Sequence, residues 1–123
     1  MPRNMSFMLT TDQIRSKTKT VTRRMGWLFL KNGDILNAVE KCQGLKKGEK
    51  VKHLCKIRVT RMQRERLNYI NQEECGREGF PEMTPDQFVE MFCKANKCEP
   101  AAIITRISFE YLEEEPTIWK TQA

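Results

Sequence analysis

Two segments of the chain alternate between apolar and polar residues with the two-residue period of a β-strand. The first segment runs from Val51 to Arg61, and its apolar face carries Val51, His53, Cys55, Ile57 and Val59. Its opposite face is basic and carries Lys52, Lys56 and Arg58. The second segment runs from Ile103 to Tyr111. We therefore expect a long strand over 51–61, with His53 on the core side, and a final strand over 103–111.

Helix starts are marked by two similar tetrapeptides. Residues 84–87 (Thr-Pro-Asp-Gln) and 10–13 (Thr-Thr-Asp-Gln) both have the form of a capping box. The tetrapeptide at 84–87 has proline at the first helical position and is followed by apolar residues at helical spacing. This motif predicts a helix over about 85–95, whereas the tetrapeptide at 10–13 predicts a short helix over roughly 11–17.

Shorter apolar stretches complete the pattern. They predict strands over 5–9, 20–24 and 35–39, the last one preceded by a turn at Asn32-Gly33-Asp34. The order of strand, helix, several strands, helix and strand indicates an α+β domain with a curled mixed sheet flanked by helices. The 123 residues fit one domain, which we place at 1–112, followed by a loose tail over 113–123.

Charge is distributed unevenly along the chain, whose net charge is +6. Residues 1–61 hold 15 Lys or Arg against 4 Asp or Glu, and residues 62–123 hold 7 against 12. A basic first half favours a polyanion such as RNA as the partner. A solvated basic surface that only aids solubility is an equally good explanation of the charge alone.

Several classes of protein are disfavoured by the composition. Five cysteines, an odd number, with no secretion signal argue against a disulfide framework. No apolar run reaches the ~18 residues of a membrane-spanning helix. Cys93 and Cys98 do not have the spacing of a zinc ribbon, and His53 is the only histidine. We therefore expect a cytoplasmic protein without metal, cofactor or membrane partner; its oligomeric state does not follow from the sequence.

A set of motifs in fixed order carries a resemblance to a known family. The set is Lys19-Thr-Val-Thr-Arg-Arg24, Gly33-Asp34, the long strand, Glu78-Gly79-Phe80, the helix with Phe88, and the final strand. In this order it resembles the ASCH family, in particular the small members common in bacteriophage and prophage, over roughly residues 5–112. The resemblance implies a PUA-like fold, which is a small mixed β-barrel flanked by helices around one cleft. This sequence differs from the family pattern at Lys17, a position where many members have glycine.

The resemblance also implies a chemistry. One small member of the family is similar to an amidohydrolase that removes the acetyl group from N4-acetylcytidine. Its nucleophile, base and proton shuttle correspond by motif to Thr22, Lys19 and Glu78, and its arginine corresponds to Arg24. In a straight strand residues three apart face opposite ways, so Lys19 and Thr22 meet only if the chain bends near Lys19. Gly79 and Phe80 are expected to set a sharp turn that anchors Glu78.

Three functions remain open. The first is an RNA-binding or modified-nucleoside-binding domain with a basic cleft, and its ligand-binding residues are expected to be Thr20, Arg23, Arg24, Trp27, Lys52, Lys56 and Arg58. The second is an enzyme, either the amidohydrolase or a ribonuclease. The third is an interaction module of phage origin for a host protein. An enzyme needs a largely buried Lys19 beside a cation, with Thr22 within hydrogen-bond reach at roughly 2.6–3.2 Å and Glu78 across the cleft. A plain binding domain instead predicts that Lys19 points outward.

Overall fold

The computed structural model describes residues 2–41 and 47–113, so most of the predicted tail lies outside the described residues. Their secondary structure, in chain order, is β1 (Arg3–Ser6), η1 (Met8–Thr10), α1 (Thr11–Arg15), β2 (Val21–Arg24), β3 (Ile35–Val39), β4 (His53–Arg66), η2 (Leu67–Tyr69), α2 (Gln72–Arg77), α3 (Pro85–Asn96) and β5 (Ile103–Tyr111). None of the helices in these two ranges is long and apolar enough to cross a membrane.

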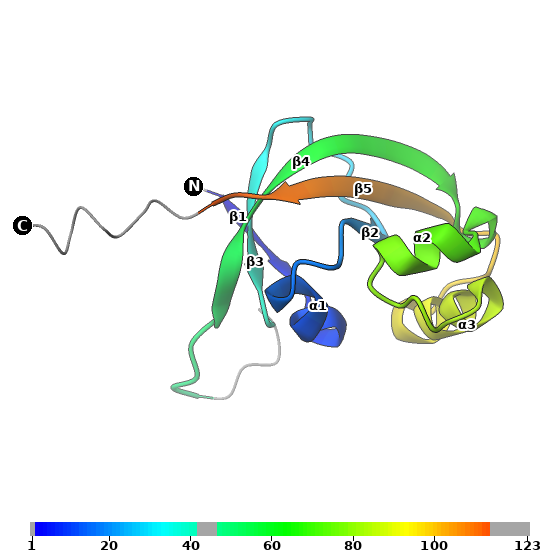
Figure 1. Cartoon of the computed structure of the whole chain (residues 1–123), viewed down its shortest axis with the longest axis horizontal. Coiled ribbons are helices and arrows are strands. Elements are labelled where there is room, and N and C mark those ends of the chain that lie inside the picture. Colours follow the sequence, from blue (N-terminus) through cyan, green and yellow to red (C-terminus); the bar gives the residue numbers. More distant parts are fainter. Residues whose placement is uncertain (1, 42–46, 114–123) are drawn as a thin grey trace, which may run out of the picture.

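The strands form one curled, mixed sheet, which confirms the predicted α+β class. The strand order is β1-β3-β4-β5-β2, with β1 and β3 parallel and every other pair antiparallel. Figure 1 shows β4 and β5 running side by side as long curved strands, with α2 and α3 gathered at one end and α1 near the other sheet half. β1 and β2 are the two edges of this sheet.

The two edge strands, β1 and β2, are not paired through their backbones, but the side chain of Arg24 connects them. The Arg24 Nη2 on β2 donates a hydrogen bond to the Ser6 carbonyl oxygen on β1, at 2.6 Å. The same guanidinium lies over the ring of Phe7, 4.8 Å from its centroid, which adds a cation–π contact. The curled sheet is therefore a half-barrel whose open seam is spanned by Arg24.

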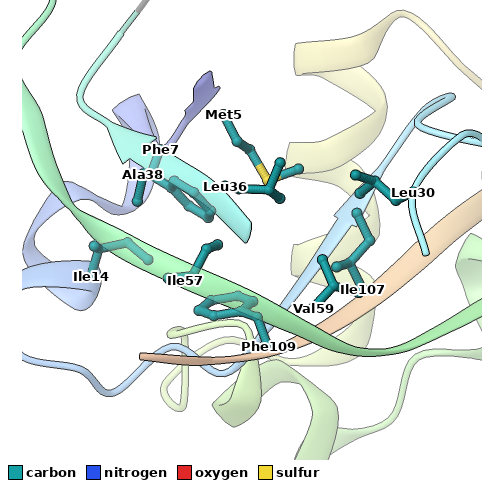
Figure 2. Packing of buried hydrophobic residues seen from close by; sticks show 10 residues of the cluster. All are labelled: Met5, Phe7, Ile14, Leu30, Leu36, Ala38, Ile57, Val59, Ile107 and Phe109. Carbon is teal, nitrogen blue, oxygen red and sulfur yellow. The ribbon is translucent and has the colours of Figure 1, made fainter. Parts of the chain in front are cut away.

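Two apolar clusters fill the two ends of the fold. Figure 2 shows the first, where side chains from β1, α1, β3, β4 and β5 converge; its buried members are Met5, Phe7, Ile14, Leu30, Leu36, Ala38, Ile57, Val59, Ile107 and Phe109. The second lies between α2, α3 and the far ends of β4 and β5; its buried members are Leu67, Ile70, Cys75, Phe88, Phe92 and Ile104. β5 contributes to both clusters, with Ile107 and Phe109 in the first and Ile104 in the second.

The capping box before α3 is confirmed, and the one before α1 is wrong. At α3 the Thr84 hydroxyl accepts from the Gln87 N–H at 3.2 Å, and the Gln87 side chain accepts from the Thr84 N–H at 2.9 Å. Thr10 makes no side-chain cap hydrogen bond. Gln13 instead donates to the Gly79 carbonyl at 3.1 Å, so its side chain is used in a tertiary contact.

The predicted core position of His53 is also wrong, because the side chain is exposed. The register with β3 shifts between Ala38 and Val39, and Cys55 and His53 pair with these two successive residues. Leu54 is left as the extra residue and packs against the first apolar cluster. The alternation that starts at Cys55 therefore does not extend back to His53.

Helix α2 was not predicted from the sequence. Asn71 caps it, since its side chain accepts from the Glu74 N–H at 2.9 Å. The helix spans six residues and buries a single apolar side chain, that of Cys75. Such a short element has no apolar stripe that periodicity can detect.

Ion pairs, rather than apolar contacts alone, fasten α2 to the sheet. The Glu74 carboxylate accepts from Arg23 on β2 at 2.8 Å, from Arg106 on β5, and from Arg77 on its own helix. Burial by itself would raise the pKa of Glu74, but the hydrogen bonds from Arg106, Arg77 and Arg23 outweigh it and hold this pKa well below its usual range. Glu74 is therefore ionised at all ordinary pH values.

We expect Glu74→Gln to lower the free energy of unfolding by roughly 3 kcal/mol, because it removes one charge of a buried ion pair and leaves Arg23 undercompensated. Since the pKa of Glu74 is lowered on folding, its contribution is present at neutral pH and decreases as the pH falls below about 4.3, the value of free glutamate. Urea unfolding at neutral and acidic pH measures both effects. Glu73→Gln is the matched control, because Glu73 contacts only Arg77 and is mostly exposed; equal losses in the two variants would contradict this assignment.

Lys17, the position at which the sequence differs from the ASCH pattern, adopts the left-handed conformation that favours glycine. Its φ is 62°, in the left-handed region, and its N–H donates to the Ile14 carbonyl at 3.1 Å, which ends α1. The tight turn therefore forms without glycine, at a conformational cost of about 1–2 kcal/mol.

Lys17→Gly should accordingly raise the free energy of unfolding by roughly 1 kcal/mol, which a thermal melt detects as a higher Tm. Lys94→Gly is the control with opposite sign, because Lys94 lies inside α3, where glycine costs about 1 kcal/mol. A decrease in Tm for both variants would show that the turn at Lys17 is not strained.

Candidate functional site

Lys19 lies in the bend between α1 and β2 and points into the protein. Its carbonyl accepts from the Tyr111 hydroxyl at 2.6 Å, and the next residue, Thr20, donates its N–H to the Arg77 carbonyl at 2.8 Å. β2 begins only at Val21, so the chain bends where the sequence analysis requires it to bend. Lys19 is 2% exposed, which contradicts the outward orientation expected for a plain binding domain.

Glu78 caps the end of α2 and faces Lys19. The Lys19 Nζ donates to the Glu78 Oε1 at 2.7 Å and to the Glu78 carbonyl oxygen at 2.8 Å. The other carboxylate oxygen, Oε2, accepts from the Arg23 Nη1 at 3.1 Å. Arg23 therefore holds Glu78 with one nitrogen and Glu74 with the other, at 2.8 Å.

The turn after Glu78 depends on glycine. Gly79 has a φ of +98°, and a Cβ atom there would lie 2.8 Å from the Gln13 Cγ. The carbonyl of the same glycine accepts from the Gln13 side chain at 3.1 Å, and Phe80 packs against the second apolar cluster. The expected sharp turn with an aromatic anchor is thus present, and it fixes the direction of Glu78.

Burial is the main influence on the charge of Lys19. Burial lowers the pKa of Lys19, the carboxylate of Glu78 opposes this, and Arg24 and Arg23 lower it further, so that the pKa lies below its ordinary value. A neutral lysine has two N–H groups and one lone pair. Both N–H groups are accounted for by the two oxygens of Glu78, so the neutral form keeps its lone pair for another donor.

Thr22 and Arg24 lie on one face of β2. The Arg24 Nε donates to the Thr22 Oγ at 3.1 Å, and Thr22 is 3% exposed. The hydroxyl hydrogen of Thr22 is still available to an acceptor, because an hydroxyl accepts and donates at the same time. Arg24 therefore contacts Thr22 while it also spans the seam to β1.

These side chains line one cavity of about 220 Å³. Its polar residues are Ser6, Thr10, Lys19, Thr22, Arg23, Arg24, Glu78 and Asn96. Its apolar wall comes from η1, α3 and Phe80 and consists of Met8, Leu9, Phe80, Phe88, Met91, Phe92 and Ala95. This wall was not predicted from the sequence, because an apolar helical stripe that lines a cavity has the same pattern as one that packs into a core. Met8 and Leu9, which are largely exposed, gave no signal.

Several predicted ligand-binding residues lie elsewhere in the described structure. The cavity lining does not include Thr20, Trp27, Lys52, Lys56 or Arg58. Trp27 packs against the first apolar cluster. Lys52 pairs with Glu40 at 3.7 Å and Arg58 with Glu110 at 3.1 Å. The basic face of β4 therefore does not join the motif arginines around this cavity.

A metal site needs several ligand side chains grouped together. Within residues 2–41 and 47–113, no three His, Cys, Asp or Glu side chains are grouped so that they could hold a metal ion. The two glutamates nearest the cavity are both engaged by arginine or lysine. The cavity chemistry is therefore that of an amine, an hydroxyl, a carboxylate and guanidinium groups.

No protein-family model matches the sequence, and no curated protein matches it significantly. Solved structures do match. Protein EF3133 from Enterococcus faecalis, of the family DUF984, aligns with a TM-score of 0.65 and 17% identity over 91% of this chain and 80% of that chain. The hypothetical protein PH0355 aligns with a TM-score of 0.63 and 16% identity over 91% of this chain and 100% of that chain.

An ASCH domain from Lactobacillus crispatus aligns with a TM-score of 0.65 and 14% identity, over 89% of this chain and 78% of that chain. At these identities the likeness concerns the fold alone. The chain thus has the small α+β fold, with its curled mixed sheet, of ASCH and PUA-like domains.

Proposed function

We propose that the cavity binds an N-acylated nucleoside and that Lys19, Thr22 and Glu78 hydrolyse its amide bond. The observation that carries this proposal is the buried Lys19, which contacts Glu78 at 2.7 Å beside a cavity that Thr22 also lines. A lysine used only to attract an anion gains nothing from 2% exposure, because burial penalises its charge. The resemblance of the motif to a cytidine amidohydrolase of the ASCH family supports the same assignment.

The first half of the reaction uses the three side chains in sequence. The Thr22 Oγ attacks the acyl carbon, its proton passes to neutral Lys19, and the carbonyl electron pair moves to the oxygen beside Arg24. The Lys19 proton then crosses the 2.7 Å contact to Glu78 and on to the nitrogen of the nucleobase. Cleavage of the C–N bond releases the nucleoside and leaves an ester on Thr22.

The second half restores the side chains. Water attacks the ester carbon and gives a proton to Lys19, and the Thr22 oxygen leaves and takes that proton back. The products are a carboxylic acid and the free amine of the base. Arg23 contributes by holding Glu78 in contact with Lys19, so it is a positioning residue in this scheme.

The cavity suits a ligand of this kind. Its apolar wall of phenylalanines and methionines is able to cover the face of one base, and its polar end supplies the reacting groups. At about 220 Å³ it lies below the roughly 300–1,000 Å³ of pockets for drug-sized ligands. We therefore expect a nucleoside or one nucleotide of RNA, with the rest of the ligand outside.

A second candidate function, the binding of RNA or a nucleotide without chemistry, is favoured by one observation. The ion pair between Lys19 and Glu78 stabilises the charged form of lysine and opposes its use as a base. In this case Arg24 and Lys19 contact a phosphate or a base edge, and the cavity is a recognition pocket.

Turnover of N4-acetylcytidine by variants separates the two functions. Thr22→Ala and Lys19→Arg should each reduce kcat/KM by at least about a hundredfold, because they remove the nucleophile and the base. Nucleoside binding, measured by calorimetry, should persist in Thr22→Ala. Thr20→Ala is the matched control, because Thr20 is exposed and does not line the cavity. Absence of turnover in the wild-type protein, with nucleotide binding intact, would favour the binding function.

The pH dependence tests the state of Lys19. Because the base must be neutral and its pKa is lowered, kcat/KM should rise with pH along a limb whose midpoint lies below about 10.4, the value of free lysine. Arg24→Gln removes a neighbouring cation and should move this midpoint upward. A profile without a rising limb, or one that Arg24→Gln does not move, would count against Lys19 as the base.

A further inference from the structure

The loop between β2 and β3 presents apolar side chains to solvent. Leu28 is 63% exposed, Phe29 50% and Met25 41%. Three large apolar side chains within one short loop form a patch rather than scattered exposure. This loop lies on a different part of the surface from the cavity, whose lining contains none of the three.

The loop is held in one shape. Gly26 and Trp27 both have positive φ, 78° and 56°, and such a conformation is rare for a tryptophan. The Thr105 hydroxyl on β5 donates to the Gly26 carbonyl, at 2.5 Å. Trp27 packs against the first cluster, with its ring 5.4 Å from that of Phe29. The strained backbone is thus fixed from both sides, with Leu28 and Phe29 directed outward.

A hollow lies between this loop and the sheet. It has a volume of about 270 Å³ and is lined by Leu28, Leu30, Met62, Gln63, Arg64 and Thr105. Its lining combines apolar side chains with an amide and a guanidinium. The apolar side chains suit the face of a planar ring such as a nucleobase, and the amide and the guanidinium suit its polar edge.

One arginine, Arg64, lines the hollow, and two more lie on the neighbouring elements. The Arg3 guanidinium lies over the Phe29 ring at 4.3 Å from its centroid. Arg64 and Arg66 are exposed two positions apart on β4, on one face, so their Cα atoms lie roughly 6.6 Å from each other. Among the described residues, no carboxylate forms an ion pair with any of these three arginines. Their charge is available to an anionic partner.

We propose that this loop and the adjoining part of β4 bind single-stranded nucleic acid. One base enters the hollow beside Leu28, and an adjacent base packs on the exposed surface of Phe29, next to the Arg3 guanidinium that lies over its ring. The phosphates contact Arg3, Arg64 and Arg66. An exposed aromatic side chain beside cations that have no acidic partner among the described residues is the combination that holds single-stranded nucleic acid. The site is separate from the cavity, so it does not depend on the hydrolytic function proposed above.

The test is fluorescence anisotropy with labelled oligouridylate and oligothymidylate. Phe29→Ala should weaken binding roughly tenfold, because stacking of one base contributes about 1–3 kcal/mol. Arg64→Gln should weaken binding and reduce the slope of log K against log salt by about 0.7, the value for one phosphate contact on a single strand. Circular dichroism confirms the fold of each variant.

Arg61→Gln is the matched control. Arg61 is also exposed on β4, but it pairs with Ser108, on the face that Arg106 shares, whereas Arg64 pairs with Thr105 beside the hollow. The Arg61→Gln variant should bind the oligonucleotides with nearly the same affinity as the wild-type protein. Equal effects of Arg61→Gln and Arg64→Gln, or unchanged affinity in Phe29→Ala, would overturn the site. Binding of the wild-type protein to anionic lipid vesicles but to neither oligonucleotide would overturn it as well, in favour of a membrane surface.

Discussion

The arrangement of the site depends on one buried guanidinium, that of Arg23, which is held between Glu74 and Glu78 and also lies 3.6 Å from the Glu65 carboxylate. It donates to Glu74 at 2.8 Å and to Glu78 at 3.1 Å, and its side chain has no exposed surface. α2 is too short to be stable alone, so these ion pairs and Cys75 determine where it lies. Since Glu78 ends α2 and contacts both Arg23 and Lys19, Arg23 helps to fix the positions of Glu78 and Lys19. Its Nε has no hydrogen-bond partner among the described residues, which is a cost of this geometry.

Much of the fold was accessible from the sequence, for physical reasons that differ between elements. α3 was predicted almost to its ends, because its capping box and apolar stripe are local signals. β5 and most of β4 were predicted, because apolar residues alternate with polar ones over most of each strand. α2 was not, because charges rather than apolar residues fasten it. The predicted core position of His53 was wrong because the change of register depends on the pairing with β3, which cannot be inferred from the local sequence.

The candidate site was predictable only in its polar half. The motif places Lys19, Thr22, Arg24 and Glu78 around one cavity, as expected from the family resemblance. The apolar wall was not predicted, because a phenylalanine that lines a cavity looks in sequence like one that fills a core. The cations of β4 were expected at the same cleft. They lie elsewhere because the strand order separates β4 from β2 by β5.

Arg24 couples two properties of the molecule that are usually independent. Its guanidinium is the polar contact that spans the half-barrel from β2 to β1, and it also lines the cavity next to Thr22. A ligand that accepts hydrogen bonds from Arg24 therefore contacts the same side chain that holds the carbonyl of Ser6. By thermodynamic reciprocity, anything that changes how firmly the two edges are held together changes the affinity of the cavity, and an occupied cavity alters the rigidity of the barrel in turn.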